Sequence, residues 1–443
     1  MRIRSIIVSL LVLAIGSVSA SAQNRVIARD PAGLADLQNI CTGILGIQLC
    51  KVVEPIGDPQ SQVYLVAPGL ISDVNQLLQF LLGLLLGKGG DAELDQLLRL
   101  PGFANSPSWS APPSLYDMIP VNYYGTTVWH GYVSQPAVGI IRLTKAQSYF
   151  HTSGKGIVAV IDTGVDPTHP ALQRVLLSGY DFTRNKNGGS ELRDLSNPGD
   201  IGDNGSPYQV NQSTMAVVNG NGSNLLSQSK YAGFGHGTMV SGIVHLVAPT
   251  ASILPLKAFH SDGSGNLSDI LRAIYYGVQN GANALNMSFD ISTYSQELDK
   301  ANQYAAQQGL VSMGSVGNNG KAMVVYPAGL HNVMGIASTT NNDTVSSFSN
   351  YGQPPVWVGS PGEGIVTTYP FATYAAGWGT SFSTPFVSGT AALLRQINTS
   401  SNEASASKAV SHAKYINSEL GYGRLDVYQA AAAWCQAVGC PER

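Results

Sequence analysis

The sequence contains few charged residues. Lys, Arg, Asp and Glu together make up 12% of its 443 residues, against about 25% in typical soluble proteins, and the formal net charge is −3. No basic patch that would favour a nucleic-acid partner is present. The 49 glycines, together with many Ser, Asn, Thr and Gln residues, predict a polar but largely uncharged surface with many tight loops.

Long apolar runs are also missing. A membrane-spanning helix needs about 20 apolar residues, and the run from Ile6 to Ile15 is shorter. Arg2 and Arg4 precede this run, and the tripeptide Ala-Ser-Ala at 20–22 matches the cleavage pattern of a signal peptide. We therefore predict a signal peptide over residues 1–22, a secreted or periplasmic protein, and no membrane association once the peptide is removed. An uncleaved membrane anchor is the alternative.

Cysteine is scarce, with four residues in the whole chain. An even count in an oxidising compartment indicates disulfides, and four cysteines allow three pairings. We expect Cys41 to pair with Cys50 and Cys435 with Cys440, because each pair is close in sequence and the two pairs lie at opposite ends of the chain. No Cys/His spacing resembles a zinc site, so no metal-ligating residue is predicted.

The chain is too long for one average domain, and its first part differs in pattern from the rest. Residues 23–113 predict a small α+β domain that ends in a Pro- and Ser-rich linker, Pro101 to Pro113. Its predicted strands are Arg25 to Arg29, Gln48 to Val53 and Gln62 to Ala67, and its predicted helices are Leu34 to Leu45, Val74 to Leu86 and Ala92 to Leu100. The apolar run Leu77 to Leu86 is expected to be a buried helix.

From Gly156 onward, strands alternate with helices, which predicts an α/β domain with a parallel sheet and helices on both faces. The predicted strands are Ile157 to Ile161, Ile253 to Ala258, Ala284 to Met287, Leu310 to Gly314 and Val333 to Ala337, and the helices include Leu267 to Gln279 and Ser295 to Gln308. In such sheets, sites collect in the crevice at the carboxyl ends of the strands.

Four polar residues are predicted near such a crevice. Asp162 follows the first strand, His236 opens an apolar helix between two glycines, and Asn318 lies in a Gly/Asn loop after another strand. Ser381 lies where a Gly-rich loop becomes a helix, and Pro385 is expected in the first turn of that helix. Taken singly, each has an ordinary explanation as a cap, a helix start or a turn residue.

Taken together, the four residues supply the parts of a nucleophilic reaction. A serine hydroxyl is a poor nucleophile and needs a base, and an imidazole base needs a carboxylate to orient it. The tetrahedral intermediate needs hydrogen-bond donors at its oxyanion. Ser381, His236, Asp162 and Asn318 are of the types that these roles require.

Five segments resemble the sequence blocks of subtilisin-like serine peptidases, the subtilases, in the chain order Asp, His, Ser. They are Val158 to Asp166, Gly235 to Gly242, Asn286 to Phe289, Ser315 to Gly320 and Gly379 to Gly389, and the resemblance covers Gln135 to Ala433. It implies a three-layer α/β domain with a mainly parallel sheet, and an endopeptidase that forms an acyl-enzyme. In this scheme Ser381 is the nucleophile, His236 the general base and acid, Asp162 the orienting carboxylate, and Asn318 with the Ser381 N–H the oxyanion hole.

The resemblance also implies residues that contact substrate. They lie on two edges that flank the substrate's main chain and its first side-chain pocket, and they are Ser288, Phe289, Asp290, Val316 and Gly317. Asp290 stands where the family has glycine, so the family's side-chain specificity is not carried over. If its carboxylate points inward, basic or polar side chains should be accepted and acidic ones disfavoured.

Two other departures from the family pattern remove no catalytic atom. Met239 stands where the family has a second histidine, and Phe382-Ser383 replaces Met-Ala. Between the helix of His236 and the strand at Ile253 there is no room for the inserted loop that carries a calcium site in subtilisin. No cofactor is expected for the chemistry, and a structural calcium ion remains open.

Other classes fit the sequence less well. Asp162-Thr163-Gly164 matches the aspartic-protease tripeptide, but no second Asp-Thr/Ser-Gly occurs. A sedolisin would have glutamate in place of His236, and an esterase of the α/β-hydrolase type would have Gly-x-Ser-x-Gly around Ser381. The alternative outside the enzymes is a secreted binding or adhesion module on an inactive subtilase scaffold.

Chain order gives the first domain a more specific interpretation. Residues 23–113 lie between the predicted signal peptide and a peptidase domain over 114–434 with its core at 135–433, followed by a tail at 435–443. In the resembling family such a segment assists folding and covers the cleft until it is cleaved. We therefore predict a prosegment that the enzyme removes itself. The expected partners are protein or peptide substrates and this prosegment, and we expect a monomer.

Overall fold

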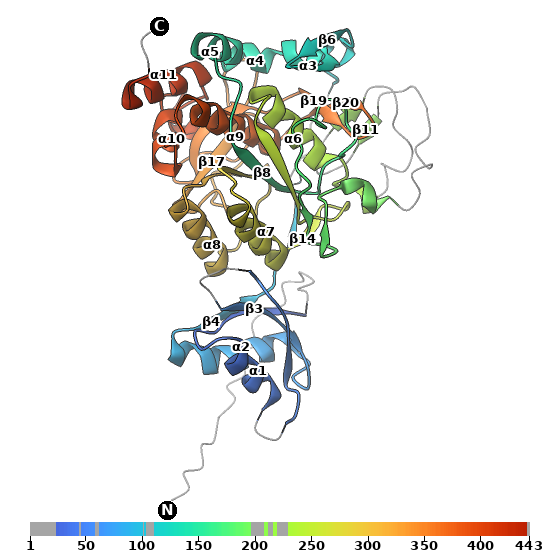
Figure 1. The fold of residues 1–443 in the computed structure, drawn as a ribbon, viewed down its shortest axis with the longest axis vertical. Helices are drawn as coiled ribbons and strands as arrows, with labels where there is room; N and C mark the ends of the chain where they lie inside the picture. The colour runs from blue at the N-terminus through green and yellow to red at the C-terminus, as the bar shows by residue number, and fades with distance from the viewer. Residues whose placement is uncertain are drawn as a thin grey trace, which may run out of the picture.

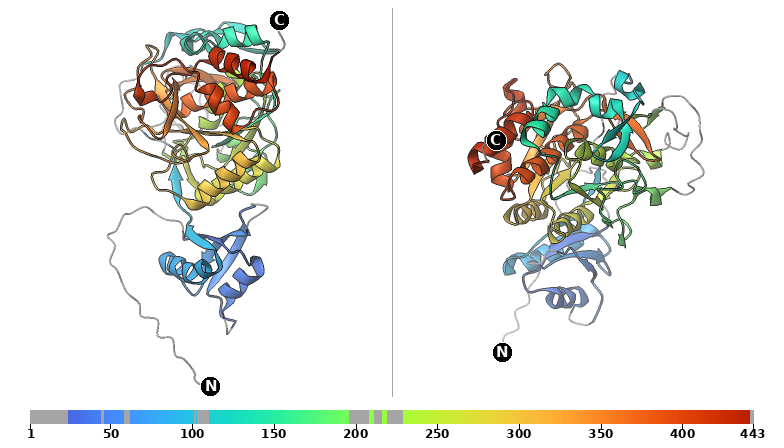
Figure 2. Two further views of the ribbon diagram at one scale, coloured as in Figure 1. Left: turned by 90° about the vertical axis from the view of Figure 1, so that its left-hand side faces the viewer. Right: turned by 45° about the horizontal axis from the view of Figure 1, so that its top comes forward.

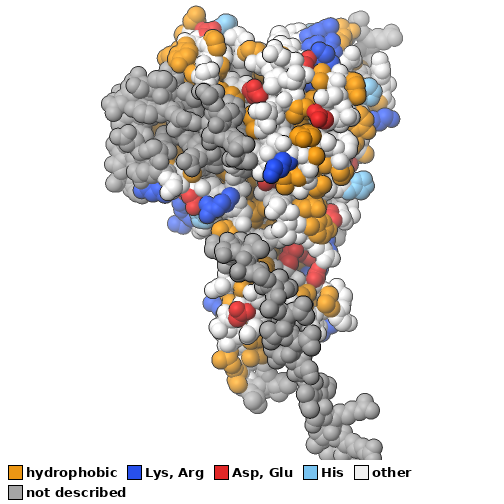
Figure 3. Space-filling model, turned by 180° about the vertical axis from the view of Figure 1, so that it is seen from behind, with side chains coloured by type: hydrophobic (Ala, Val, Ile, Leu, Met, Phe, Trp, Pro, Cys, Tyr) orange, Lys and Arg blue, Asp and Glu red, His pale blue; other side chains and the backbone are white. Residues whose placement is uncertain are grey.

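The computed structural model describes residues 24–43, 46–57, 62–100, 102, 110–195, 208–210, 216–218 and 229–440, without the side chains of 208–210 and 216–218. The predicted signal peptide lies outside this range. The described chain forms a small N-terminal unit and a large unit (Figure 1). Within the described part, no helix combines the length and the apolar character needed to cross a membrane. Charged side chains are sparse and scattered on the face in Figure 3, in keeping with the composition.

The N-terminal unit is an antiparallel sheet covered by two helices. Its elements are β1 (Val26–Arg29), α1 (Leu34–Thr42), β2 (Cys50–Pro55), β3 (Val63–Pro68), α2 (Val74–Leu85) and β4 (Asp91–Leu94), with strand order β2-β3-β1-β4. Alternate residues of a strand point to opposite faces, so Val26 and Ala28 pack against α1 and α2, whereas Ile27 packs in the same cluster as residues of the large unit. The sheet therefore lies between its own helices and the large unit (Figure 1).

Two predictions for this unit are wrong. The segment Ala92 to Leu100 is not a helix but forms β4 and β5 (Leu97–Arg99), because β4 pairs with β1 and β5 pairs with β14 (Ser264–Asn266) of the large unit. These distant partners override the helical preference of a Leu-rich segment. The run Leu77 to Leu86 is helical but buries only one face: Leu81 is fully buried, whereas Leu84 and Leu86 are 42% and 60% exposed.

An eight-stranded sheet forms the centre of the large unit. Its order is β10-β9-β13-β8-β15-β16-β17-β18, and every adjacent pair from β9 to β18 is parallel. The strands are β8 (Ile157–Asp162), β9 (Tyr180–Asp181), β10 (Lys186–Asn187), β13 (Ser252–Lys257), β15 (Ala284–Met287), β16 (Val311–Ser315), β17 (Val333–Thr339) and β18 (Val356–Pro361). The predicted strands are confirmed to within about two residues at their ends, which is the usual uncertainty of such boundaries.

Helices cover both faces of this sheet (Figure 2). Ala159 and Ile161 of β8 pack toward α7 (Leu267–Gln279) and α8 (Gln296–Gln307), which face the N-terminal unit. Val158 and Val160 pack in the opposite layer. That layer contains α5 (Leu143–Phe150), α6 (His236–Val247), α9 (Thr380–Ile397), α10 (Glu403–Val410) and α11 (Val427–Val438). The three-layer, mainly parallel fold expected from the sequence is confirmed.

Smaller elements complete the large unit. An antiparallel sheet of order β11-β12-β20-β19 consists of β11 (Tyr208–Val210), β12 (Ala216–Val218), β19 (Ile365–Tyr369) and β20 (Thr373–Gly377). The remaining elements of the large unit are η2 (Pro113–Tyr116), β6 (Pro120–Tyr123), β7 (Thr126–Trp129), α3 (His130–Ser134), α4 (Pro136–Ile140), η3 (Glu191–Asp194), η5 (Ser229–Tyr231) and η6 (Ser418–Leu420), and in the N-terminal unit η1 (Leu86–Lys88) follows α2. Disulfides join Cys41 to Cys50 and Cys435 to Cys440.

The segment from η2 to α5 is packed against helix α6. Tyr123 Oη donates a hydrogen bond to the carbonyl oxygen of Leu246, and Tyr132 Oη donates to that of Gly242, both at 2.6 Å. Gln135 bonds to both the carbonyl oxygen and the amide of Val366. This segment is therefore an integral part of the large unit.

Candidate active site

Asp162 and His236 are in direct contact. Asp162 ends β8 and His236 begins α6, and the distance between Asp162 Oδ1 and His236 Nδ1 is 2.7 Å. Both side chains are 1% exposed. The carboxylate can only accept here, so Nδ1 is the donor and Nε2 carries the lone pair. In the described part of the chain Nε2 has no hydrogen-bond partner, so it is available to take up a proton.

Ser381 is the second residue of α9, which begins at Thr380. Its Oγ donates a hydrogen bond to the carbonyl oxygen of Ser288 at 3.1 Å. The neighbouring Phe382 ring lies 5.7 Å from the His236 ring, which puts the start of α9 beside the Asp162–His236 pair. A serine–histidine hydrogen bond is not formed among the described contacts. In free enzymes such bonds are often loose and tighten on substrate binding.

Pro385 lies inside α9, not in its first turn as the sequence led us to expect. A proline has no N–H, so the carbonyl oxygen of Ser381, four residues earlier, lacks its helical donor. Ser288 Oγ donates to this oxygen at 2.9 Å instead. The helix therefore starts earlier than predicted, because a side chain from the loop after β15 replaces the missing bond.

Asn318 follows β16 and is held by the start of α9. Its Oδ1 accepts hydrogen bonds from the Thr380 N–H and the Thr380 Oγ1, each at 2.9 Å. Since a backbone N–H can only donate, the accepting atom must be the amide oxygen, and Nδ2 points the other way. The first N–H groups of a helix have no intrahelical partner. Asn318 Nδ2 and the Ser381 N–H are thus suited to bind an oxyanion.

Of the five residues expected to contact substrate, three have side chains that point into the protein. Phe289 packs against Phe259 with ring centroids 5.2 Å apart, and Val316 is fully buried in an apolar cluster. Ser288 Oγ accepts from Asn286 Nδ2 at 2.9 Å and donates to Ser381. Any contact of these three with substrate would therefore come from their backbone.

Asp290 and Gly317 remain as the two positions that face each other. A Cβ atom on Gly317, whose φ is +90°, would lie 3.0 Å from Asp290 Oδ2. This oxygen is buried and has no hydrogen-bond partner within the described residues. Burial raises the pKa of Asp290 to about 7. The carboxyl thus points toward the Gly317 edge, where it can act on a side chain bound between the two edges.

The crevice beside these residues holds part of the N-terminal unit. In β5, Leu98 pairs with Gly265 of β14, and the Leu100 N–H donates to the carbonyl oxygen of Gly263 at 2.8 Å. On its other side, Arg99 forms an antiparallel bridge with Asp290. Leu98 and Leu100 are buried and Arg99 is exposed. The alternation of Leu, Arg and Leu is a strand signal that the sequence analysis missed.

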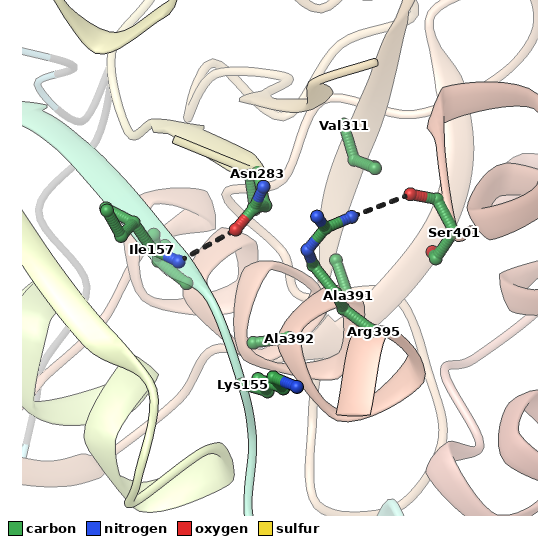
Figure 4. A pocket seen from close by; sticks show the side chains of 10 residues that line it. Lys155, Ile157, Asn283, Val311, Ala391, Ala392, Arg395 and Ser401 are labelled. Atoms are coloured by element: carbon green, nitrogen blue, oxygen red, sulfur yellow. Dashed lines mark hydrogen bonds between the residues drawn. The ribbon is translucent and has the colours of Figure 1, made fainter. Parts of the chain in front are cut away.

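A small cavity lies at the opposite end of the sheet (Figure 4). It is lined by residues at the amino ends of β8, β15 and β16, among them Ile157 and Asn283, and by Arg395 of α9. Its volume of about 10 Å³ has room for about one water molecule. It is therefore separate from the crevice.

Four charged side chains near the site are paired with one another. Arg184 bonds to Asp181 and Asp194, and Lys257 Nζ donates to Asp194 Oδ2 at 2.7 Å. Within the described ranges, no three His, Cys, Asp or Glu side chains are grouped so that they could hold a metal ion.

Residues 154–424 match the family model described as the subtilase family, peptidase S8. The chain belongs to the subtilase family. This subtilase is 33% identical over 279 residues to a thermophilic serine proteinase of Bacillus sp. (strain AK1), covering 62% of this chain and 61% of that one. It is 33% identical over 274 residues to thermitase of Thermoactinomyces vulgaris, covering 59% of this chain and 83% of that one.

Solved structures agree with this assignment. A cold-adapted subtilisin-like serine proteinase superposes on the subtilase with a TM-score of 0.50 and 27% identity, covering 62% of this chain and 90% of the other. A lanthipeptide protease shares the fold with a TM-score of 0.52 at 21% identity, covering 68% and 98% of the two chains. Asp162, His236, Asn318 and Ser381 all lie within the matched range 154–424. The N-terminal unit lies outside it.

Proposed function

We propose that this subtilase is a secreted serine endopeptidase that acts through Ser381, His236 and Asp162. The observation that carries the proposal is the 2.7 Å hydrogen bond between Asp162 and His236 beside the start of α9. The comparisons support the proposal, because two of the similar proteins are named serine proteinases. The signal-peptide pattern at residues 1–22 supports export.

In the proposed mechanism each group has its own step. Ser381 Oγ attacks the carbonyl carbon of the peptide bond while His236 Nε2 takes up its proton, and Asp162 stabilises the imidazolium that forms. Asn318 Nδ2 and the Ser381 N–H stabilise the oxyanion of the tetrahedral intermediate. When the C–N bond breaks, His236 gives the proton to the leaving amine and an acyl-enzyme remains. Water then attacks the ester, with His236 again as base, and restores Ser381.

We further propose a prosegment within residues 23–113, comprising the N-terminal unit, that the enzyme removes. Support comes from β5, which lies in the crevice as an extended strand with backbone partners on both sides. Two helices of the large unit also receive carboxylates from the N-terminal unit: Glu93 accepts from Ser295 Oγ at the start of α8, and Asp95 accepts from the Ser268 N–H at the start of α7. The first N–H groups of a helix have no partner within the helix, so these side chains complete the two helix starts.

We infer the region of cleavage from the direction of β5. Arg99 is opposite Asp290 on an antiparallel partner, so the chain leaves Arg99 in the direction of Ser288. Ser381 Oγ bonds to the Ser288 carbonyl oxygen, so the scissile bond should follow Leu100 closely. Pro112 packs near Gly364 and Leu115 is fully buried, which favours a mature chain that begins before Pro112.

N-terminal sequencing of the secreted wild type and of Ser381→Ala tests both proposals. The wild type should yield a mature chain that starts between Leu100 and Pro112, and Ser381→Ala should keep the prosegment. A fluorophosphonate should label the wild type and not Ser381→Ala. A wild type that resists labelling would instead support the inactive binding module, and an active enzyme that still begins near Gln23 would remove the prosegment proposal.

A further inference from the structure

The carboxyl group of Glu191 lies between the two elements that carry Asp162 and His236. Glu191 begins η3 and is 0% exposed. A buried carboxyl group costs free energy unless it has partners. Its Oε2 accepts from the Gly235 N–H at 2.7 Å and from Thr163 Oγ1 at 3.2 Å, and its Oε1 accepts from Thr238 Oγ1. Glu191 is not part of any segment on which the resemblance to subtilases rests.

All three donors adjoin the catalytic pair. Thr163 directly follows Asp162, Gly235 directly precedes His236, and Thr238 is two residues after His236. Each threonine oxygen also accepts a backbone hydrogen bond that joins the segment after β8 to the start of α6. Thr163 Oγ1 accepts from the Gly237 N–H at 3.0 Å, and Thr238 Oγ1 accepts from the Asp166 N–H at 2.8 Å. Each of the two hydroxyl groups thus accepts from a backbone amide and donates its proton to Glu191.

Helix α6 has no cap of its own. Its N-cap residue is Gly235, which has no side chain and a φ of +88°. Thr163 Oγ1, which bonds to Glu191, accepts from the Gly237 N–H as an N-cap side chain would, and Glu191 itself, 45 positions before His236, accepts from the Gly235 N–H. The start of α6, and with it the position of His236, therefore depends on a residue from η3.

We infer that Glu191 is a positioning residue for the catalytic pair: its carboxyl group fixes the end of β8 against the start of α6 and so sets the Asp162–His236 hydrogen bond. Errors of about 1 Å in such positions can cost about 100-fold in rate. This inference rests on the proposed peptidase activity in those experiments that measure turnover, and not in the experiment that observes the Asp162–His236 hydrogen bond directly.

The substitution Glu191→Gln tests this positioning role. The amide nitrogen of glutamine cannot accept a hydrogen bond, so at least one of the three donors to Glu191 loses its acceptor. Asp181→Asn is the matched control, since Asp181 is equally buried and pairs with Arg184 rather than with the catalytic elements. At a temperature where all variants are folded, Glu191→Gln should lower kcat by about 10- to 100-fold with KM within about twofold. Asp181→Asn should leave kcat within about twofold.

A second pair of variants covers the case in which Glu191→Gln does not fold. Thr163→Val removes one hydroxyl that bonds to Glu191 and should lower kcat by about tenfold or more, whereas Thr163→Ser, which keeps the hydroxyl, should restore it. Equal losses in both, or a Glu191→Gln effect no larger than that of Asp181→Asn, would overturn the inference.

Proton NMR of the Asp162–His236 hydrogen bond gives a readout without turnover. The downfield proton on His236 Nδ1 should shift or broaden in Glu191→Gln and stay unchanged in Asp181→Asn. If the wild type cleaves no peptide yet this shift occurs, the peptidase proposal fails and the positioning role stands. If the resonance is the same in all three proteins, the positioning role is excluded.

Discussion

Ser288 Oγ donates a hydrogen bond to the carbonyl oxygen of Ser381 at 2.9 Å, and the hydroxyl of Ser381 donates to the carbonyl oxygen of Ser288 at 3.1 Å. The first bond exists because Pro385 cannot donate to Ser381. The loop after β15 and the start of α9 are thereby joined at Ser381, the proposed nucleophile, so a change in one should affect the other.

Replacing Ser288 should therefore reduce stability in a way that depends on Pro385. Ser288→Ala leaves the buried Ser381 carbonyl without a donor, which should cost about 1–3 kcal/mol. In a Pro385→Ala background an N–H is available at position 385, so the loss should be smaller. Tm values measured in the Ser381→Ala background, which prevents self-digestion, give this double-mutant cycle. Equal losses with and without Pro385 would contradict the explanation.

His236→Ala and Ser381→Ala should each lower kcat by several orders of magnitude, and the double variant should lose little more. The reason is that the two residues act as a unit, so removing either one removes the whole mechanism. Steady-state kinetics on a chromogenic peptide, with the rate in enzyme-free buffer as the background, measure this. Losses that simply multiply would refute the coupling.

Asn318→Ala should lower kcat by about 100- to 1,000-fold with little change in KM, because its amide is used in the transition state rather than in substrate binding. Thr380→Ser keeps both donors to Asn318 Oδ1 and serves as the control. A rise in KM alone would make Asn318 a substrate-binding residue instead.

Asp290 should favour basic side chains in substrates, and increasingly so as the pH rises. Its carboxyl group has a pKa of about 7, so it is neutral below that value and negatively charged above it. The ratio of kcat/KM for Lys against Leu peptides should rise through pH 7 in the wild type and be flat in Asp290→Gly. If Asp290→Gly has the same side-chain preference as the wild type, Asp290 does not determine that preference.

The N-terminal unit, which we propose to be a prosegment, should stay bound more tightly in acid after cleavage. Burial and the Glu297 charge raise the pKa of Glu93 from 4.5 to about 7 in the complex, so the complex holds a proton that free Glu93 loses. The stabilisation of the complex by the proton on Glu93 is therefore complete below pH 4.5 and is lost as the pH rises through about 7. Since one pKa unit is a factor of ten in affinity, retention should fall by about tenfold or more from pH 5 to pH 8.

Size-exclusion chromatography of the processed protein at both pH values measures that retention. Glu93→Gln stays neutral and should retain the prosegment at pH 8, with a residual pH dependence from Asp95, whose pKa is also raised by burial. Asp36→Asn, which changes a carboxyl group paired with Lys88 within the prosegment, is the control. Retention that does not change with pH in the wild type would exclude the mechanism.

The proposed catalytic positions could be picked out in the sequence because their signals are local. Asp162 ends a run of buried strand residues, His236 lies between glycines at the start of an apolar helix, and Ser381 follows a Gly-rich loop. Strand ends and helix starts are set by residues a few positions away, and the carboxyl ends of parallel strands meet at one edge of a sheet. The family, the three layers and the contact of Asp162 with His236 follow from these local signals.

Other features depend on residues far apart in the chain. The strand β5 forms by pairing with β14, which lies more than 160 positions later in the chain. The early start of α9 requires Ser288, and the Gly235 N–H just before α6 finds its acceptor in Glu191. Local preference assigns a Leu-rich segment to a helix and Pro385 to a first turn, and it has no signal for Glu191. Only the folded chain supplies the unpaired donors and acceptors that decide these cases, because a buried polar group takes whichever partner the tertiary structure brings to it.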